Sequence, residues 1–157
     1  MLIRTHLLIT LLFILIFFSS VQNKVVFIVV ALIATFIPDI DTKFSKLGKR
    51  KIFRPLQFFV SHRGIFHSFI FLILICVLLY LWKPVIAFGV LIGYGLHLLA
   101  DSLTIQGIRP FYPFKRRLRW KIKTGGRFEV VLFVGFLIAD LWLLLNMALN
   151  LSLFSRL

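Results

Sequence analysis

The sequence is poor in acidic residues and nearly free of cysteine. Only five of its 157 residues are Asp or Glu, and the single cysteine, Cys76, excludes an internal disulfide. Charged residues make up only 15% of the chain while hydrophobic residues make up 61%, which is not the composition of a water-soluble globule. We therefore expect a single integral-membrane domain over residues 1–157.

The chain contains five apolar stretches. They cover residues 7–18, 25–37, 65–82, 85–100 and 130–149. Because an α-helix rises 1.5 Å per residue, crossing a hydrocarbon core of ~30 Å takes about 20 residues. The last stretch is long enough alone, whereas the first two need flanking residues or a thinned bilayer. The sequence predicts an all-α, polytopic membrane protein, a helical bundle of about five transmembrane helices.

The first apolar stretch also has some features of a signal peptide. Arg4 precedes a short apolar core, and Ser19 and Ser20 follow it. No small-x-small cleavage pattern stands out, and residues 21–24 form a tight connection to the second stretch. We therefore expect an uncleaved helical hairpin that retains His6.

Basic residues are divided unequally between the two expected faces of the membrane. Seven of the 19 Lys and Arg lie between Lys43 and Arg63, and eight lie between Arg109 and Arg127. With five spans, these two loops and Arg4 share one face, which predicts that the amino terminus and both basic loops are cytoplasmic. The net charge of +14 then serves as an orientation signal and a contact for anionic head groups of membrane lipids. We expect no nucleic-acid partner, because no known binding module is visible.

This topology brings almost every ligand-type side chain to the cytoplasmic ends of the helices. All four histidines and four of the five acids share that layer, whereas residues that merely flank helices would be expected at both faces. These residues are His6, Asp39, Asp41, His62, His67, His97, Asp101 and Glu129. Mixed imidazole and carboxylate ligands suit Zn²⁺ best, with Mn²⁺ or Fe²⁺ as alternatives, and the set is large enough for one or two ions. The sequence therefore predicts a metal site at the helix ends.

Local spacing is compatible with this prediction without requiring it. His97 and Asp101, four residues apart, project from one helix face, so both bind metal or Asp101 orients His97. Pro38 disfavours continuation of the second helix, which puts Asp39 and Asp41 on a turn. For each element alone, a hydrogen-bonded interfacial histidine or an Asp that caps a loop remains the alternative.

The segment around His62 and His67 places two imidazoles and a guanidinium in front of an apolar stretch. The two histidines are five residues apart, so His62 is expected on the loop and His67 on the helix. Arg63 cannot bind a cation, but its planar fork suits a phosphate or a carboxylate. Asp140 lies deeper in the last stretch and is expected to pair with a polar group inside the bundle, outside the site.

Six sequence blocks carry a family resemblance from Thr5 to Glu129. They read TH, PDID, HRGIFHS, GYGLHLLADSLTIQG, RPFYPF and TGGRFE. In order and spacing they resemble the YdjM-like family of small inner-membrane proteins, described as membrane-bound metal-dependent hydrolases and distantly similar to the zinc-dependent phospholipase C and P1 nuclease group. The resemblance implies a polar set of His6, Asp39, Asp41, His62, Arg63, His67, His97, Asp101 and Glu129. Two departures, Phe66 for a usual Thr and Gly126 for a usual Ser, bear on substrate contacts more than on metal binding.

Residues and resemblance together predict a membrane-bound metal-dependent hydrolase that cleaves a phosphoester of a lipid or lipid-linked substrate. Arg63 would hold the phosphate charge, and Glu129 or an Asp that is not a ligand, such as Asp101, would move the proton. A soluble phosphoester stays open as the substrate. Two other classes remain: a metal-ion transporter, whose sites should lie near the bilayer midplane, and a non-catalytic membrane protein with a structural metal site. The sequence does not indicate whether the protein is a monomer or an oligomer.

Overall fold

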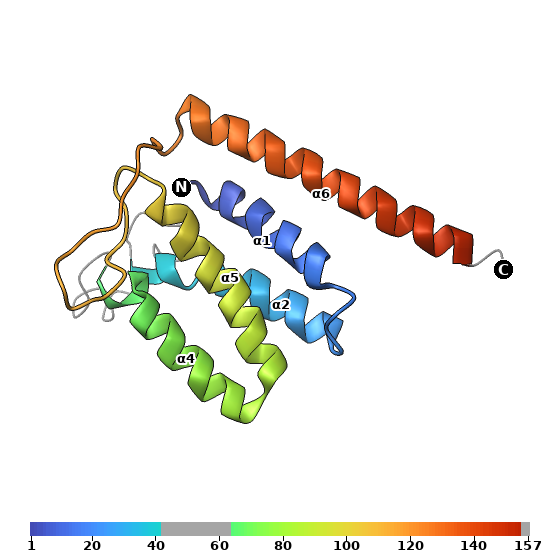
Figure 1. Cartoon of the computed structure of the whole chain (residues 1–157), viewed down its shortest axis with the longest axis horizontal. Coiled ribbons are helices and arrows are strands. Elements are labelled where there is room, and N and C mark those ends of the chain that lie inside the picture. Colours follow the sequence, from blue (N-terminus) through green and yellow to red (C-terminus); the bar gives the residue numbers. More distant parts are fainter. Residues whose placement is uncertain (42–63, 155–157) are drawn as a thin grey trace.

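The described part of the chain is all-helical, as the sequence predicts. The computed structural model describes residues 1–41 and 64–154. Within them the five α-helices are α1 (Ile3–Phe17), α2 (Lys24–Ala34), α4 (Phe69–Trp82), α5 (Pro84–Ser102) and α6 (Arg127–Phe154). Two short 3-10 helices, η1 (Pro38–Asp41) and η3 (Ile65–His67), follow α2 and precede α4. In Figure 1, α5 lies in the middle of the bundle and α6 lies on the outside next to α1.

Local side-chain chemistry sets several of the helix boundaries. The expected apolar helix over residues 65–82 divides at Ser68, whose Oγ accepts a hydrogen bond from the Phe71 amide (3.2 Å) and caps α4. Asn23 caps α2 in the same way through the Val26 amide (3.4 Å). Pro84 opens α5 at the first helical position, where its missing N–H costs nothing.

Two of the described helices are long and apolar enough to cross a membrane. They are Pro84–Ser102 in α5 and Arg127–Asn150 in α6. The apolar helices α1 and α4 contain 15 and 14 residues, and α2 contains 11. At 1.5 Å per residue these three are about 16 to 22 Å long, which is shorter than a ~30 Å hydrocarbon core. Helix length alone therefore supports two of the five predicted spans.

Glycines let α5 approach α2 very closely. A Cβ at Gly93 would lie 2.0 Å from the Ala31 carbonyl oxygen, and one at Gly89 would lie 3.2 Å from that of Phe27. The contacts advance by four residues on both helices, so α2 and α5 run in the same direction. Such small-residue contacts are typical of helix pairs that pack in membranes.

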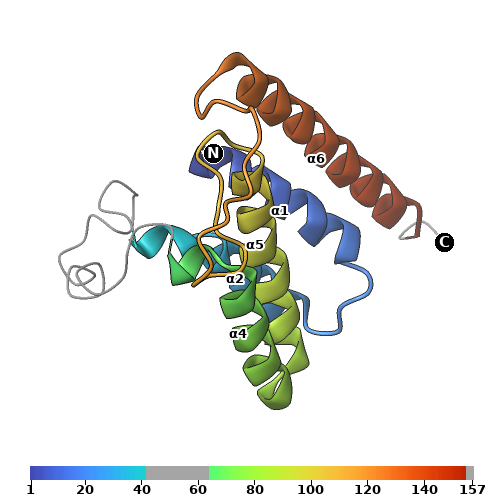
Figure 2. The same cartoon turned by 60° about the vertical axis from the view of Figure 1, so that its left-hand side comes forward.

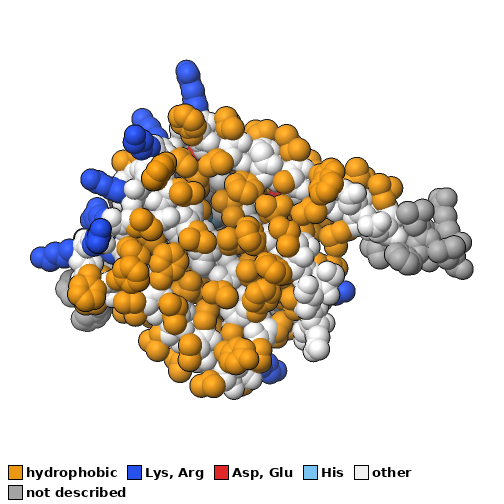
Figure 3. Space-filling view, viewed as in Figure 1, with side chains coloured by type: hydrophobic (Ala, Val, Ile, Leu, Met, Phe, Trp, Pro, Cys, Tyr) orange, Lys and Arg blue, Asp and Glu red, His pale blue; other side chains and the backbone are white. Residues whose placement is uncertain are grey.

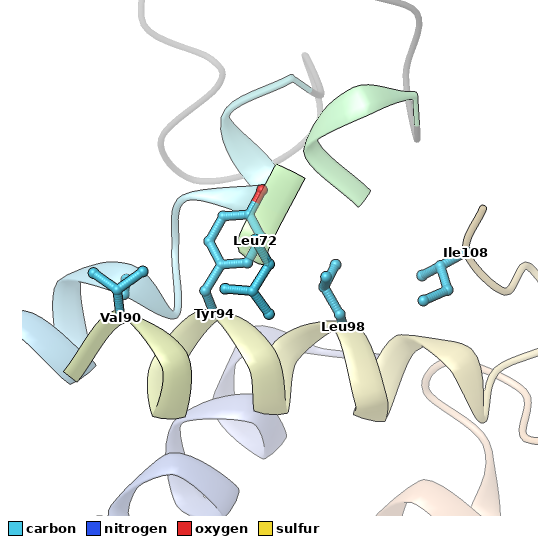
Figure 4. Packing of buried hydrophobic residues seen from close by; sticks show 6 residues of the cluster. Leu72, Val90, Tyr94, Leu98 and Ile108 are labelled. Atoms are coloured by element: carbon cyan, nitrogen blue, oxygen red, sulfur yellow. The ribbon is translucent and has the colours of Figure 1, made fainter. Parts of the chain in front are cut away.

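Of the two apolar core clusters, one lies mainly between α4 and α5 and the other joins α1, α2 and α5. Figure 4 shows Leu72 of α4 meeting residues of α5, with Ile108 of the following loop at the end of the row. The first cluster consists of Ala34, Leu72, Val90, Tyr94, Leu98 and Ile108. The Tyr94 hydroxyl donates to the Phe66 carbonyl oxygen (2.5 Å), which ties η3 to α5.

The loop of residues 103–126 folds back along the end of α5. Isolated bridges join Thr104 to Ile122 and Ile108 to Leu118. Residues 118 and 122 thus pair with the beginning of the loop through isolated bridges. In Figure 2 the loop lies beside the amino-terminal end of α1 and leads into α6.

Candidate metal centre

Five of the predicted metal ligands meet at one end of the bundle. The helices α1 and α6 begin at this end, whereas α2 and α5 finish there (Figure 1). Two overlapping groups have ligand atoms that all lie within 4.8 Å of one another: His6 with His97 and Asp101, and Asp39 with His67 and His97. We call these five residues the His/Asp cluster. His97 belongs to both groups and is therefore its centre.

The ring of His97 is oriented by the backbone of α2. Its Nδ1 lies 2.8 Å from the Thr35 carbonyl oxygen. Because a carbonyl oxygen can only accept, Nδ1 carries the proton and Nε2 keeps the lone pair of the neutral ring. Nε2 is buried without a hydrogen-bond partner in the described part of the chain, 3.7 Å from Asp39 Oδ1. Metal-binding histidines typically have this arrangement, with the second ring nitrogen bonded to a carbonyl or carboxylate.

The glycine contacts between α2 and α5 explain why His97 meets this carbonyl. His97 lies four residues after Gly93, and Thr35 lies four residues after Ala31, the residue that Gly93 contacts. The close parallel approach of the two helices thus continues directly into the site. Thr35 is itself held by a buried hydrogen bond between its hydroxyl and that of Thr10 (3.0 Å).

His6 and His67 pack against the His97 ring from two directions. The His6 ring stacks on it with centroids 4.0 Å apart and planes 7° apart. The His67 ring lies at 5.9 Å with its plane inclined by 70°. Three imidazoles from α1, η3 and α5 therefore share a single buried space.

The carboxylate of Asp101 faces two of these rings. Its Oδ1 lies 3.4 Å from His6 Nε2, without hydrogen-bond geometry, and its Oδ2 lies 3.9 Å from His67 Nε2. The amino group of Met1 also donates to Oδ1. The carboxylate is almost fully buried; the Met1 amino group offsets part of its loss of water, and a metal ion bound here would do the same.

Asp39 brings a second carboxylate into the cluster from η1. Burial raises the pKa of its carboxyl above the usual range, and repulsion by the Asp101 carboxylate adds to this rise, although nearby histidines oppose it. The folded protein alone therefore stabilises the ionised carboxylate of Asp39 less well than water does. A bound divalent cation would reverse that preference, because it interacts favourably with both carboxylates.

The donor set and its spacing fit a transition metal. Ligand atoms about 2.1 Å from a tetrahedral ion lie roughly 3.4 Å from one another. The observed separations of 3.4 Å, 3.7 Å and 3.9 Å are close to that value. Imidazole nitrogens with carboxylate oxygens are the ligands preferred by Zn²⁺, and Mn²⁺ or Fe²⁺ also accept them.

Three other predicted residues cannot be placed at the cluster by their side chains. Asp41 ends η1, two residues after Asp39, and its side chain lies outside the description. His62 and Arg63 lie outside the described residues altogether. Their assignments as ligands and as the phosphate-binding residue stay predictions.

Glu129, predicted to be catalytic, holds the start of α1 instead of facing the histidines. Its Oε1 accepts hydrogen bonds from the Leu2 amide (2.6 Å) and the Thr5 hydroxyl (2.9 Å). Its Oε2 accepts one from the Gly125 amide (2.6 Å). The buried carboxylate therefore fastens the beginnings of α1 and α6 and the preceding loop to one another, next to His6.

Sequence reasoning missed the supporting polar residues and expected a partner for Asp140. No sequence pattern marks Thr10 and Thr35, which join α1 to the end of α2 through their hydroxyl groups. Asp140 is buried, and neither carboxylate oxygen has a hydrogen-bond partner in residues 1–41 or 64–154. The expected pairing of Asp140 is therefore not found in that part of the chain.

The fold and the cluster define a small helical membrane protein with a buried His/Asp centre at one end. Residues 1–155 match the family described as YdjM inner membrane protein, and the chain belongs to this family. The predicted family resemblance is thus confirmed, and an inner-membrane location is supported by the family name.

Relatives in three bacteria are similar to this chain. The inner membrane proteins YdjM of Escherichia coli (strain K12) and Shigella flexneri are each 30% identical over 125 residues, covering 72% of this chain and 64% of theirs. The uncharacterized protein YvsG of Bacillus subtilis (strain 168) is 31% identical over 116 residues, covering 69% of this chain and 71% of its own. The match thus spans less than two thirds of the two YdjM proteins. No solved structure matches the chain significantly.

Proposed function

We propose that the protein is a membrane-bound metal-dependent hydrolase that cleaves a phosphoester of a lipid or lipid-linked substrate. The observation that supports this most is the state of His97: its Nδ1 is fixed on the Thr35 carbonyl while its buried Nε2 has no hydrogen-bond partner among the described residues. An imidazole lone pair that is oriented and buried beside two carboxylates is suited to bind a metal ion.

The metal would be held by the His/Asp cluster. His97 supplies Nε2, His6 and His67 supply imidazole nitrogens, and Asp39 and Asp101 supply carboxylate oxygens. Zn²⁺ is the preferred ion, with Mn²⁺ or Fe²⁺ as alternatives, and Asp41 and His62 would complete a second site. A bound divalent ion would supply Lewis acidity, acidifying a water and polarising a phosphoryl oxygen.

The remaining roles fall to residues that do not bind the metal. Arg63 would bind the charged oxygens of the phosphate with its planar fork. All the described hydrogen bonds of Glu129 go to the chain itself, so we assign it the positioning of α1 and His6. If only one of the two cluster carboxylates binds the metal, the other, Asp39 or Asp101, would transfer the proton.

The proposed topology places the cluster at the cytoplasmic head-group layer. All five helices would be embedded in the membrane, with α1, α2 and α4 spanning a thinned region or ending within it. Figure 3 shows most of the visible Lys and Arg side chains at the end of the molecule where α6 begins, over an otherwise apolar surface. A basic end facing the cytoplasm agrees with the positive-inside rule and with contacts to anionic lipids.

Metal content tests the site. Purified protein should retain about one or two transition ions per chain, and Asp39→Ala, His67→Ala and His97→Ala should each lower that number. Asp140→Ala is the matched control, because it also removes a buried carboxylate but lies outside the cluster. Unchanged metal content in all three cluster variants would mean that the cluster is only a hydrogen-bonded network.

Activity tests the reaction. Metal-loaded protein should cleave a member of a panel of phospholipids, lipid-linked phosphates and soluble phosphoesters, and Arg63→Ala should keep the metal while losing about ten- to a hundredfold in kcat/KM. Metal-replete protein that cleaves nothing in the panel would favour a structural metal. Metal uptake into proteoliposomes would favour a transporter.

Labelling tests the orientation. A Ser45→Cys variant should resist a membrane-impermeant thiol reagent in intact cells and react after permeabilisation, because the sequence predicts a cytoplasmic loop there. A Cys76→Ala background removes the natural thiol. Equal labelling in both conditions would contradict the topology.

A further inference from the structure

Arg109 is a second guanidinium at the end of the bundle that carries the His/Asp cluster. The residue is partly buried, and its Nε is fully buried without a hydrogen-bond partner in the described part of the chain. Burying part of a permanently charged group without an acceptor is costly. Such a group is expected to have a partner in the functional state of the protein.

The backbone on both sides of Arg109 is firmly held. Ile108 is part of the apolar core and exchanges two backbone hydrogen bonds with Leu118 (2.9 and 3.0 Å). The Pro110 carbonyl oxygen accepts a hydrogen bond from the Phe69 amide (2.9 Å), which opens α4. Because Phe69 comes two residues after His67, Arg109 is fixed between the core and the turn that carries a cluster histidine.

The chain offers Arg109 almost no carboxylate. Only five acids are present, against 19 Lys and Arg. Asp39 and Asp101 belong to the His/Asp cluster, Glu129 accepts three hydrogen bonds from the chain, and Asp140 lies along α6. No ion pair joins Arg109 to these four carboxylates, and the side chain of the fifth acid, Asp41, lies outside the described part of the chain. None of these four carboxylates is its acceptor, which points to a partner from outside the described part of the chain.

We propose that Arg109 binds a phosphate group next to the His/Asp cluster. This inference rests on the proposed function for the kind of anion, because the substrate of a phosphoesterase must bring its phosphate to the metal ligands. The guanidinium suits this task, since Nε–H and one Nη–H donate in parallel to two phosphate oxygens. Arg109 thus joins Arg63 as an anion-binding residue, and it is the one whose backbone the core fixes in place.

The phosphate has two possible sources. It belongs either to a lipid head group or to a soluble phosphate compound. The exposed side chains of Phe111 and Phe114, on the same loop, suit contact with lipid at head-group depth. The two sources share the same recognition chemistry and are separated by the choice of probe.

Phosphate binding by the purified full-length protein tests this proposal. Binding of inorganic phosphate is measured by calorimetry, and binding of phosphatidic acid is measured in nanodiscs against a phosphatidylcholine background. Arg109→Gln should weaken binding of at least one probe about tenfold or more. Arg116→Gln is the matched control, because it removes an exposed arginine from the same loop and should change affinity less than about twofold. Arg109→Lys keeps the positive charge but loses the planar guanidinium with its two parallel donors. This variant should bind phosphate about three- to tenfold more weakly than the parent protein.

The outcomes separate this proposal from the proposed function. If Arg109→Gln, but not Arg116→Gln, weakens binding of inorganic phosphate, Arg109 binds a phosphate group in general. If it weakens only the binding of phosphatidic acid, the ligand is a lipid head group. Equal effects of Arg109→Gln and Arg116→Gln, or parent-like binding by Arg109→Lys, would overturn the proposal. If Arg109→Gln fails to fold, the binding affinity of Arg109→Lys tests the proposal in its place. Metal content and phosphoesterase activity, measured on the same samples, report separately on the proposed hydrolase.

Discussion

The two long apolar helices α5 and α6 occupy opposite environments although both are long enough to span a membrane. In the spanning window of α5, 72% of the residues are buried inside the protein, whereas in that of α6 only 11% are. The helix α5 contacts α1, α2 and α4, whereas the main contact of α6 is with α1 (Figure 2). α6 is also the more apolar of the two.

This difference teaches how a small membrane protein builds a polar centre. The α5 helix has glycines where it meets α2 and then His97 and Asp101 at the same four-residue spacing, so close packing and the cluster belong to one helix face. The α6 helix instead exposes apolar side chains suited to lipid. Its one deep polar residue, Asp140, has no partner in the described residues.

The largest expected effect is the loss of stability when the metal is removed from the parent protein. Metal present at 1,000 times its Kd stabilises the folded state by about 4 kcal/mol. Chelation should therefore lower the midpoint of thermal unfolding strongly in the parent and in Asp140→Ala of α6, but hardly at all in His97→Ala of α5. A parent protein that unfolds at the same temperature with and without chelator would contradict a metal centre in α5.

A glycine exchange in each helix compares their packing directly. In α5, Gly93→Ala would place a Cβ 2.0 Å from the Ala31 carbonyl oxygen, so the helices must separate. We expect a loss of about 1 to 3 kcal/mol or more in the free energy of unfolding. Metal affinity should fall with it, because the Thr35 carbonyl would move away from His97. Denaturation in mild detergent and metal analysis measure both effects.

Replacing the buried carboxylate of α6 should have the opposite sign. Asp140→Leu removes two buried oxygens that have no described hydrogen-bond partner, so we expect a gain of about 1 to 3 kcal/mol. Thermal unfolding of the parent and the variant measures the change. A destabilised variant would reveal that Asp140 has a partner outside the described residues or a bound ligand.

The smallest effect is expected for the matching glycine exchange in α6. A Cβ at Gly135 would meet nothing within 4 Å, so Gly135→Ala removes only the conformational freedom of glycine. The variant should be as stable as the parent or up to about 1 kcal/mol more stable. A loss comparable to that of Gly93→Ala would show that α6 packs against another protein surface, such as a second copy of the chain.

Much of the helix pattern and the composition of the candidate site follow from the sequence. The lengths of the apolar stretches predict five helices, Pro38 marks the end of the second, and the five-span topology predicts that the histidines and most acids share one end of the bundle. These features depend on local chain geometry and on the cost of burying polar groups, which residue type and spacing express directly. They also include the family to which the chain belongs.

Only the tertiary structure decides which of these residues touch. Glu129 and Asp101 look equivalent in the sequence, yet Glu129 binds the backbone of Leu2 and Gly125 while Asp101 faces His6 and His67. The sequence alone determined a helical membrane chain with its polar residues at helix ends. The close approach of α2 and α5 at Gly93 decided that His97 presents one nitrogen to a carbonyl and the other to the cluster, because packing between distant segments sets distances that residue spacing along the chain does not contain.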